Sequence, residues 1–219
     1  MESYKRDFVL FLANNNCILR NKVLKSGRIT PIYFNFGGEI YTGKNICQLS
    51  EYYAHALHSL FIVDDKTVLF GPAMKGIPLV TETASAYCRL YAQDIRFAYN
   101  RETEKDHGEG GLLCGRVTEK DKIIILDDVF TTGDTKKDIN ALLTAHVPGV
   151  TVAGVLIGVD RKEMNADGHN TVEIFSHETG IHVHSVLTID DVLTVLQAEN
   201  LLPADWKEDI LKERTEHGC

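Results

Sequence analysis

The most informative segment of the chain reads Ile123-Ile124-Ile125-Leu126-Asp127-Asp128-Val129-Phe130-Thr131-Thr132-Gly133-Asp134-Thr135. Its first four residues are apolar and predict a buried strand at 123–126, because strands of parallel sheets are covered on both faces and read as continuous hydrophobic runs. Two carboxylates follow, then a turn rich in hydroxyl groups, and then a predicted helix that begins after Gly133 and runs to about His146. Strand, turn and helix in this order are typical of α/β proteins.

The same segment predicts a site for a phosphosugar. Its turn would gather backbone N–H groups, threonine hydroxyls and a helix N-terminus around one point, which favours a phosphate group. Gly133 lets the backbone approach the ligand closely. Asp127 and Asp128 suit ribose hydroxyls, because a charged acceptor makes the stronger hydrogen bond. The alternative is a structural turn in which the acids only cap the loop and the helix.

Length and composition fit one globular domain over residues 1–219. Hydrophobic residues make up 44% and charged residues 25% of the 219 residues, so the chain can bury a full core. The net charge of −8 argues against a protein that coats nucleic acid or an anionic membrane. We therefore expect neither nucleic acid nor a membrane as a partner.

Cysteine usage and the first residues indicate the cytoplasm. The five cysteines are odd in number and scattered, and they contain no C-x-x-C pair, which is typical of a reducing compartment. The first residues lack the layout of a signal peptide, and the longest later apolar region, 150–159, is far shorter than a membrane span.

Hydrophobic periodicity predicts elements on both sides of the central segment. The expected helices are 3–13, 45–61 with Asn45 as N-cap, 78–91, one opened by Thr188 with Asp191 as a capping pair, and 204–215. The expected strands are 32–36, 67–70, 94–99, 150–159, 171–175 and 181–186. The long polar stretch 100–111 is expected to be a loop.

Residues 123–135 resemble the phosphoribosyl-diphosphate (PRPP) motif of type I phosphoribosyltransferases. Three further segments narrow the resemblance to the orotate phosphoribosyltransferase family: Leu24-Lys25-Ser26-Gly27-Arg28, Phe70 to Pro78 (FGPAMKGIP), and Asn100 to Gly110, which contains KDHGEG. Their order and spacing are similar to that family from about residue 7 to residue 200. The PRPP motif is shared by several transferases, whereas the KSGR and KDHGEGG segments are much more specific.

The resemblance implies a type I phosphoribosyltransferase fold, with a mostly parallel central sheet flanked by helices. Its core would span about 46–187, and a small hood would come from about 1–45 plus C-terminal elements. It also implies the reaction, in which the 5-phosphoribosyl group of PRPP passes to orotate in UMP synthesis. The PRPP-binding residues would be Lys75, Arg101, Lys105, His107, Asp127, Asp128, Thr131, Thr132, Gly133, Asp134 and Thr135.

The orotate-binding residues implied by the resemblance are Lys25, Phe34, Thr131 and Arg161. An arginine fork suits a planar pyrimidine with a carboxylate better than a lysine would. The implied catalytic residues are Lys105, His107 and Lys25. Mg²⁺ is expected as a cofactor held through PRPP, without dedicated protein ligands.

Residues Arg101–Gly111 would form a lid that reaches the neighbouring subunit's site in a homodimer. Three glycines and about ten polar residues fit a lid better than a packed loop. The alternative is a solvated loop, because its acids outnumber its cations. Glu102 departs from the family, in which many members carry a lysine directly after the arginine.

Two other functions stay open at this point. The acceptor could be a different base, or the chain could be a PRPP-sensing regulator without catalysis. The acidic composition and the lack of a spare segment for a nucleic-acid-binding module argue against the regulator. His182 and His184 alternate on an expected strand and could bind a metal, but surface histidines are the simpler interpretation.

Overall fold

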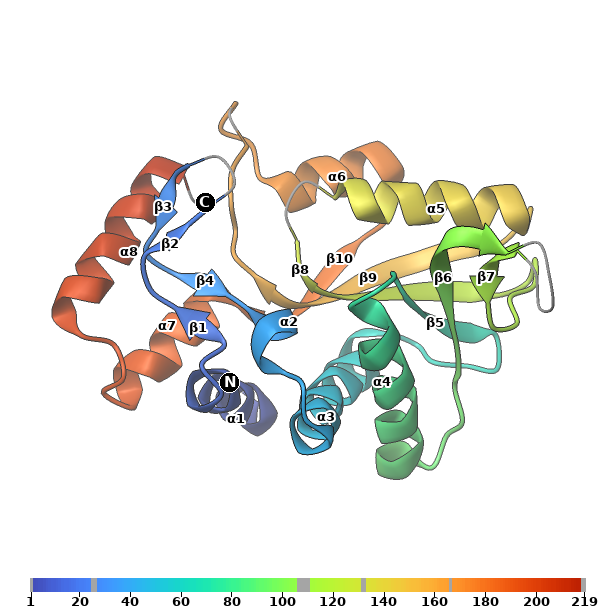
Figure 1. Ribbon diagram of the computed structural model, residues 1–219, viewed down its shortest axis with the longest axis horizontal. Coiled ribbons are helices and arrows are strands. Elements are labelled where there is room, and N and C mark those ends of the chain that lie inside the picture. The colour runs from blue at the N-terminus through green and yellow to red at the C-terminus, as the bar shows by residue number, and fades with distance from the viewer. Residues whose placement is uncertain (1, 25–26, 106–110, 131–132, 166, 218–219) are drawn as a thin grey trace.

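The structure is a computed structural model that describes residues 2–24, 27–105, 111–130, 133–165 and 167–217. A six-stranded sheet lies at its centre in the order β10-β9-β8-β5-β6-β7, as Figure 1 shows. Neighbouring strands are parallel except β6 and β7, which are antiparallel. The strands are β5 (Thr67–Gly71), β6 (Arg96–Lys105), β7 (Gly111–Cys114), β8 (Lys122–Val129), β9 (Thr151–Asp160) and β10 (Val183–Thr188). The mostly parallel sheet of the predicted fold class is confirmed.

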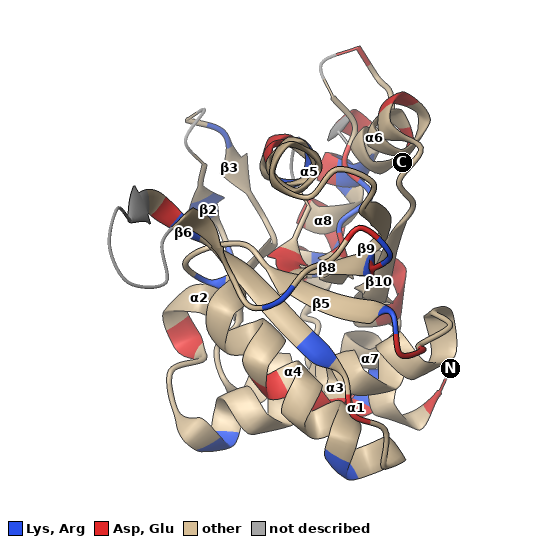
Figure 2. Cartoon of the chain, turned by 90° about the vertical axis from the view of Figure 1, so that its right-hand side faces the viewer, with Lys and Arg blue, Asp and Glu red and all other residues tan. Residues whose placement is uncertain are grey.

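Helices cover both faces of this sheet. Figure 2 shows α5 on one side and α3 and α4 on the other. The helices are α1 (Ser3–Asn14), α2 (Phe36–Glu39), α3 (Gly43–Leu60), α4 (Gly76–Tyr91), α5 (Asp134–His146), α6 (Thr171–Thr179), α7 (Ile189–Ala198) and α8 (Ala204–His217). The predicted helices near 3–13, 78–91, 134–146 and 204–215 are confirmed.

Strand β8 shows why the central segment is continuously apolar. Ile124 and Leu126 join a core cluster shared with α1, α3, α4 and α7, whereas Ile123 and Ile125 join a second cluster with α5 and α6. Side chains alternate between the two faces of a strand, so a sheet covered on both faces needs an apolar residue at every position. The apolar run at 123–126 therefore reports burial on both faces.

The predicted strand at 171–175 is wrong. These residues form the first half of helix α6 instead. The side-chain oxygen of Asn170 caps that helix by accepting hydrogen bonds from the backbone N–H groups of Val172 and Glu173, at 2.9 and 3.2 Å. Gly180 ends the helix in the left-handed region, at φ 71°, which glycine adopts without steric cost.

Four other boundaries also differ from the sequence prediction. The N-cap of α3 is Thr42, whose hydroxyl accepts from the N–H of Asn45, so the predicted Asn45 cap is wrong. The expected strand 32–36 shrinks to β4 (Tyr33–Phe34), and Phe36 opens α2. Strand β8 continues through both acids, and β6 continues to Lys105 into the stretch expected to be a loop. The capping box of Thr188 and Asp191 is confirmed.

The N-terminal segment packs against the C-terminal helix at one end of the molecule (Figure 1). Two small antiparallel sheets lie there, β1 (Ile18–Leu19) with β4 and β2 (Lys22–Val23) with β3 (Ile29–Thr30). Helix α8 attaches through the indole N–H of Trp206, which donates to the carbonyl of Pro31 at 2.7 Å. The division into a core and a hood stays a prediction.

Candidate active site

The two acids lie where three parallel strands end at one edge of the sheet. Strand β8 lies between β5 and β9, and Asp127 is in register with Ile157 of β9. The carboxyl edge of an open α/β sheet is where such folds bind ligands. A pocket at this edge is lined by Phe36, Gly37, Ile40, Ile46, Leu49, Lys75, Pro78, Leu79, Asp127 and Asp128.

Asp128 is a mostly buried acid with a perturbed pKa. Burial raises the pKa of its carboxyl group, and the adjacent charge of Asp127 raises it further. Lys75, whose Nζ lies 3.8 Å from Oδ2 of Asp128, lowers the pKa but does not cancel these effects. The other carboxylate oxygen, Oδ1, accepts from the backbone N–H of Val129 at 2.8 Å. The fold thus places at the pocket a carboxyl group whose charged form is disfavoured.

Asp127 is held by a residue that the sequence reasoning missed. Its Oδ2 atom accepts a hydrogen bond from Nζ of Lys136, which is buried in the first turn of α5. Its Oδ1 atom accepts from the backbone N–H of Asp128 at 2.9 Å. In the sequence, a lysine three residues past Gly133 would be expected at an exposed helix position. Only the fold shows that the Lys136 side chain points back at Asp127.

The loop after β5 brings Lys75 to the pocket. Gly71 ends the strand and Gly76 begins α4; a Cβ atom built on Gly71 would lie 2.2 Å from the carbonyl oxygen of Gly76. Only glycine fits this close approach, so the loop between them turns tightly. The backbone N–H of Ala73 donates to Oδ1 of Asn100 at 2.9 Å, which ties the loop to β6. The predicted diphosphate contact Lys75 therefore borders the same pocket as the acids.

The predicted phosphate turn joins β8 to α5. Gly133 has φ 82°, and a Cβ atom there would lie 2.7 Å from the Phe130 ring, so a side chain would clash. Asp134 and Thr135 begin α5 and are exposed. Thr131 and Thr132 lie outside the described residues. The helix N-terminus thus faces the carboxyl edge of the sheet, as phosphate binding requires.

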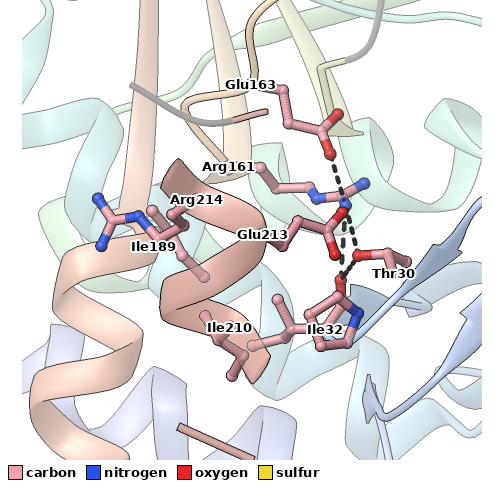
Figure 3. Close-up of a pocket in the computed structure, with 9 residues that line it drawn as sticks. Thr30, Ile32, Arg161, Glu163, Ile189, Ile210, Glu213 and Arg214 are labelled. Atoms are coloured by element: carbon pink, nitrogen blue, oxygen red, sulfur yellow. Dashed lines mark hydrogen bonds and ion pairs between the residues drawn. The ribbon is translucent and has the colours of Figure 1, made fainter. Parts of the chain in front are cut away.

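Arg161 follows β9 at the same edge and points into a small cavity, drawn in Figure 3. Its guanidinium lies 2.6 Å from Oε1 of Glu163 and 3.4 Å from the hydroxyl of Thr30. Glu213 of α8 borders the cavity, and burial raises the pKa of this carboxyl group. Arg161 is thus already paired with an acid, so an anionic ligand would have to compete with Glu163.

Of the other three predicted orotate contacts, Lys25, Phe34 and Thr131, the described residues include only Phe34. Phe34 is buried in the core at 3% exposure, and it lines neither the Arg161 cavity nor the pocket at the acids. Lys25 lies outside the described residues. The structure therefore brings Arg161 to the carboxyl edge and leaves Phe34 in the core beneath it.

Strands β6 and β7 form an antiparallel hairpin at the position of the predicted lid. Nη1 of Arg101 donates to the carbonyl of Gly111 at 2.8 Å, and Lys105 is in register with Gly111. His107 and residues 106–110 lie outside the described residues. The described part of the lid is thus strand at both ends, which corrects the expected loop at 101–105.

The described residues hold neither a cluster of metal-ligating side chains nor a membrane-spanning helix. They contain no group of three or more His, Cys, Asp or Glu side chains placed to hold a metal ion, so His182 and His184 lack further ligands there. None of their helices combines the length and the apolar character needed to cross a membrane.

Comparison with known proteins finds relatives of one name among individual sequences. No family model matches the chain. The chain is 37% identical over 199 residues to the orotate phosphoribosyltransferase of Nitrosococcus oceani, covering 90% of this chain and 88% of that protein. It is 36% identical over 216 residues to that of Salmonella arizonae, covering 95% and 99%.

Solved structures agree. The crystal structure of orotate phosphoribosyltransferase from Francisella tularensis superposes with a TM-score of 0.83 at 27% identity, covering 97% of this chain and all of that one. The chain is thus similar to these proteins in both sequence and fold. Its two acids and the predicted phosphate turn also lie at one sheet edge. The chain belongs to the orotate phosphoribosyltransferase family of pentosyl-transferring enzymes.

Proposed function

We propose that the chain transfers the 5-phosphoribosyl group of PRPP to orotate, giving orotidine 5′-phosphate and diphosphate in UMP synthesis. The observation that carries the proposal is one sheet edge that joins Asp127 and Asp128, Lys75 and the N-terminus of α5. These groups match, in order, the ribose hydroxyls, the diphosphate and the 5′-phosphate of PRPP.

The protein's share of the reaction is orientation and charge stabilisation. Asp127 and Asp128 would accept hydrogen bonds from the ribose hydroxyls, and residues 131–135 would hold the 5′-phosphate. Orotate N1 attacks the anomeric carbon with inversion, and the bond to the diphosphate oxygen breaks through an oxocarbenium-like transition state. The proton of orotate N1 is released to solvent. Lys75 would offset charge on the departing diphosphate.

Arg161 would bind the acceptor on the other side of the anomeric carbon. A guanidinium presents a rigid fork of donors that matches a carboxylate or a planar base edge. Its contact with Glu163 keeps it oriented before orotate arrives. Lys25, Phe34 and Thr131 are proposed as further orotate contacts from the family resemblance.

Lys105 and His107 would act from a lid, Arg101–Gly111, that crosses to the neighbouring subunit of a homodimer. Closure would exclude the water that otherwise hydrolyses PRPP. Arg101 stands at the base of the hairpin, where its bond to Gly111 joins the two strands.

Mg²⁺ fits this site as an ion carried by PRPP. The acids bordering the pocket offer hard oxygen acceptors for the hydroxyls around such an ion, and Mg²⁺ is commonly held through substrate oxygens and water rather than by a full protein cage. When bound, it would neutralise charge on the leaving diphosphate. We propose the cytoplasm as the compartment, which the four described cysteines support as free thiols.

The absorbance change of orotate tests the function. The protein is mixed with Mg²⁺ and PRPP, and adenine, hypoxanthine and uracil are run as parallel acceptors. We expect loss of orotate that requires both PRPP and Mg²⁺. Conversion of another base alone would remove the acceptor assignment, and silence with every base despite calorimetric binding of PRPP would indicate the sensor instead.

Glu102 gives a separate prediction about PRPP affinity. Its exposed carboxylate stands beside Arg101 on the lid strand and cannot neutralise a diphosphate. We expect Glu102→Lys to lower the Michaelis constant for PRPP by about threefold to tenfold, since each exposed charge contributes modestly. Steady-state kinetics at varied PRPP measure it, with Glu119→Lys at an exposed site as the charge control. An unchanged constant would show that another group supplies the contact.

A further inference from the structure

The position of Lys136 is energetically unfavourable for a cation, and forming the helix does not require a lysine there. Its side chain is 5% exposed and lies in the first turn of α5. Burial penalises an ammonium group, and the positive end of the helix dipole disfavours a cation there. A residue that opposes both effects needs a strong partner, and the structure provides one in Asp127.

Three groups surround the ammonium of Lys136. It donates to Oδ2 of Asp127 and, at 3.2 Å, to the carbonyl of Val129, and it lies 5.5 Å above the centre of the Phe130 ring. An ammonium has three donors; two of them make these hydrogen bonds, and the Phe130 ring adds a cation–π contact. Lys136 thereby joins the end of β8, the turn and α5 into one unit.

Asp127 keeps room for a ligand in this arrangement. A carboxylate has about four acceptor positions, and among the described residues two donors reach it, Nζ of Lys136 and the N–H of Asp128. Its side chain is 16% exposed, at the pocket. Asp127 thus presents a held, partly exposed carboxylate to the pocket.

We propose that Lys136 is a positioning residue for PRPP, which holds the Asp127 carboxylate in place for the ribose and offsets its charge toward an anionic substrate. The inference rests on the proposed function. Without Lys136, Asp127 and Asp128 would present two adjacent negative charges to a ligand that is itself strongly negative. The loss would fall on PRPP and spare orotate, which binds beside Arg161 after the next strand.

The test compares Lys136→Met with Lys137→Met. Lys137 is the next residue; its side chain is 40% exposed and pairs with Glu178 at 2.6 Å. The Lys137→Met substitution therefore removes the same charge without touching the site. We expect Lys136→Met to raise the dissociation constant of PRPP, measured by calorimetry without orotate, about tenfold. The Michaelis constant for orotate should change less than about twofold, and Lys137→Met should change neither.

A double variant keeps the test decisive if Lys136→Met folds poorly. Lys136→Met/Asp127→Asn leaves no buried charge unpaired. If Lys136 acts through Asp127, adding Lys136→Met to Asp127→Asn weakens PRPP binding no further. A further tenfold loss in that background, an equal loss for orotate, or an unchanged PRPP affinity in a folded Lys136→Met would each overturn the inference. A wild-type protein that binds no PRPP would instead overturn the proposed function.

Discussion

Replacing Lys105 by alanine is expected to lower kcat by about 100-fold to 1,000-fold. The Michaelis constants for PRPP and orotate should change by less than about fivefold. The reason is that the lysine is proposed to meet charge that develops on the diphosphate only as the bond breaks, so the transition state loses more than the ground state. Steady-state kinetics with both substrates varied provide the measurement, and Lys120→Ala at an exposed turn is the control.

Mixed dimers decide whether the lysine acts across subunits. Lys105→Ala and Asp128→Asn protein, both expected to have low activity, are mixed and allowed to exchange subunits. If the lid reaches the partner, one site of each mixed dimer combines an intact Asp128 with an intact Lys105. Random exchange would then restore about one quarter of wild-type activity. No recovery after verified exchange would place Lys105 in its own subunit's site.

Asp128→Asn is expected to lower kcat/KM by about 10-fold to 100-fold while making the fold more stable. The loss of kcat/KM follows because a neutral amide replaces the charged acceptor for a ribose hydroxyl. The gain in stability follows from the linkage between proton binding and folding, because burial and Asp127 raise the pKa of Asp128 in the folded state. The folded protein then binds the proton more tightly than the unfolded chain does.

The pH dependence gives the sign of this effect. Below the ordinary carboxyl pKa, Asp128 is protonated in both states and costs no stability. As pH rises from that value through the raised folded pKa, the wild type loses stability and the asparagine variant does not. Thermal unfolding should therefore give a higher Tm for Asp128→Asn at neutral pH and a vanishing difference in acid. Asp138→Asn, at an exposed position of α5, is the control; a lower neutral Tm for Asp128→Asn would contradict the account.

The sequence was sufficient to predict the framework of the site. An apolar run followed by two acids and a glycine predicts a buried strand, a turn and a helix, and β8 and α5 confirm it. These signals are local, because the apolar run and the glycine turn can be recognised from neighbouring residues alone. Parallel pairing of β5, β8 and β9 then places the ends of the strands together.

Contacts between distant elements could not be predicted in the same way. The alternation of Thr171 to Phe175 resembles a strand, but Asn170 and Gly180 bracket it as a helix. Both cap residues can be seen in the sequence, and in the fold they outweigh the apolar spacing. Nothing in the spacing shows that Lys136 is buried, because its partner Asp127 comes from the preceding strand. Glu163 as a competitor for Arg161 is likewise visible only in the fold.

The central claim is that PRPP binds at the carboxyl edge of β5 and β8, and a crystal structure of the protein with PRPP and Mg²⁺, grown without orotate, tests it most directly. The account predicts the ribose hydroxyls within hydrogen-bonding distance of Asp127 and Asp128, the 5′-phosphate over residues 131–135, and the diphosphate beside Lys75. PRPP bound elsewhere, or with its ribose turned away from both acids, would contradict the assignment.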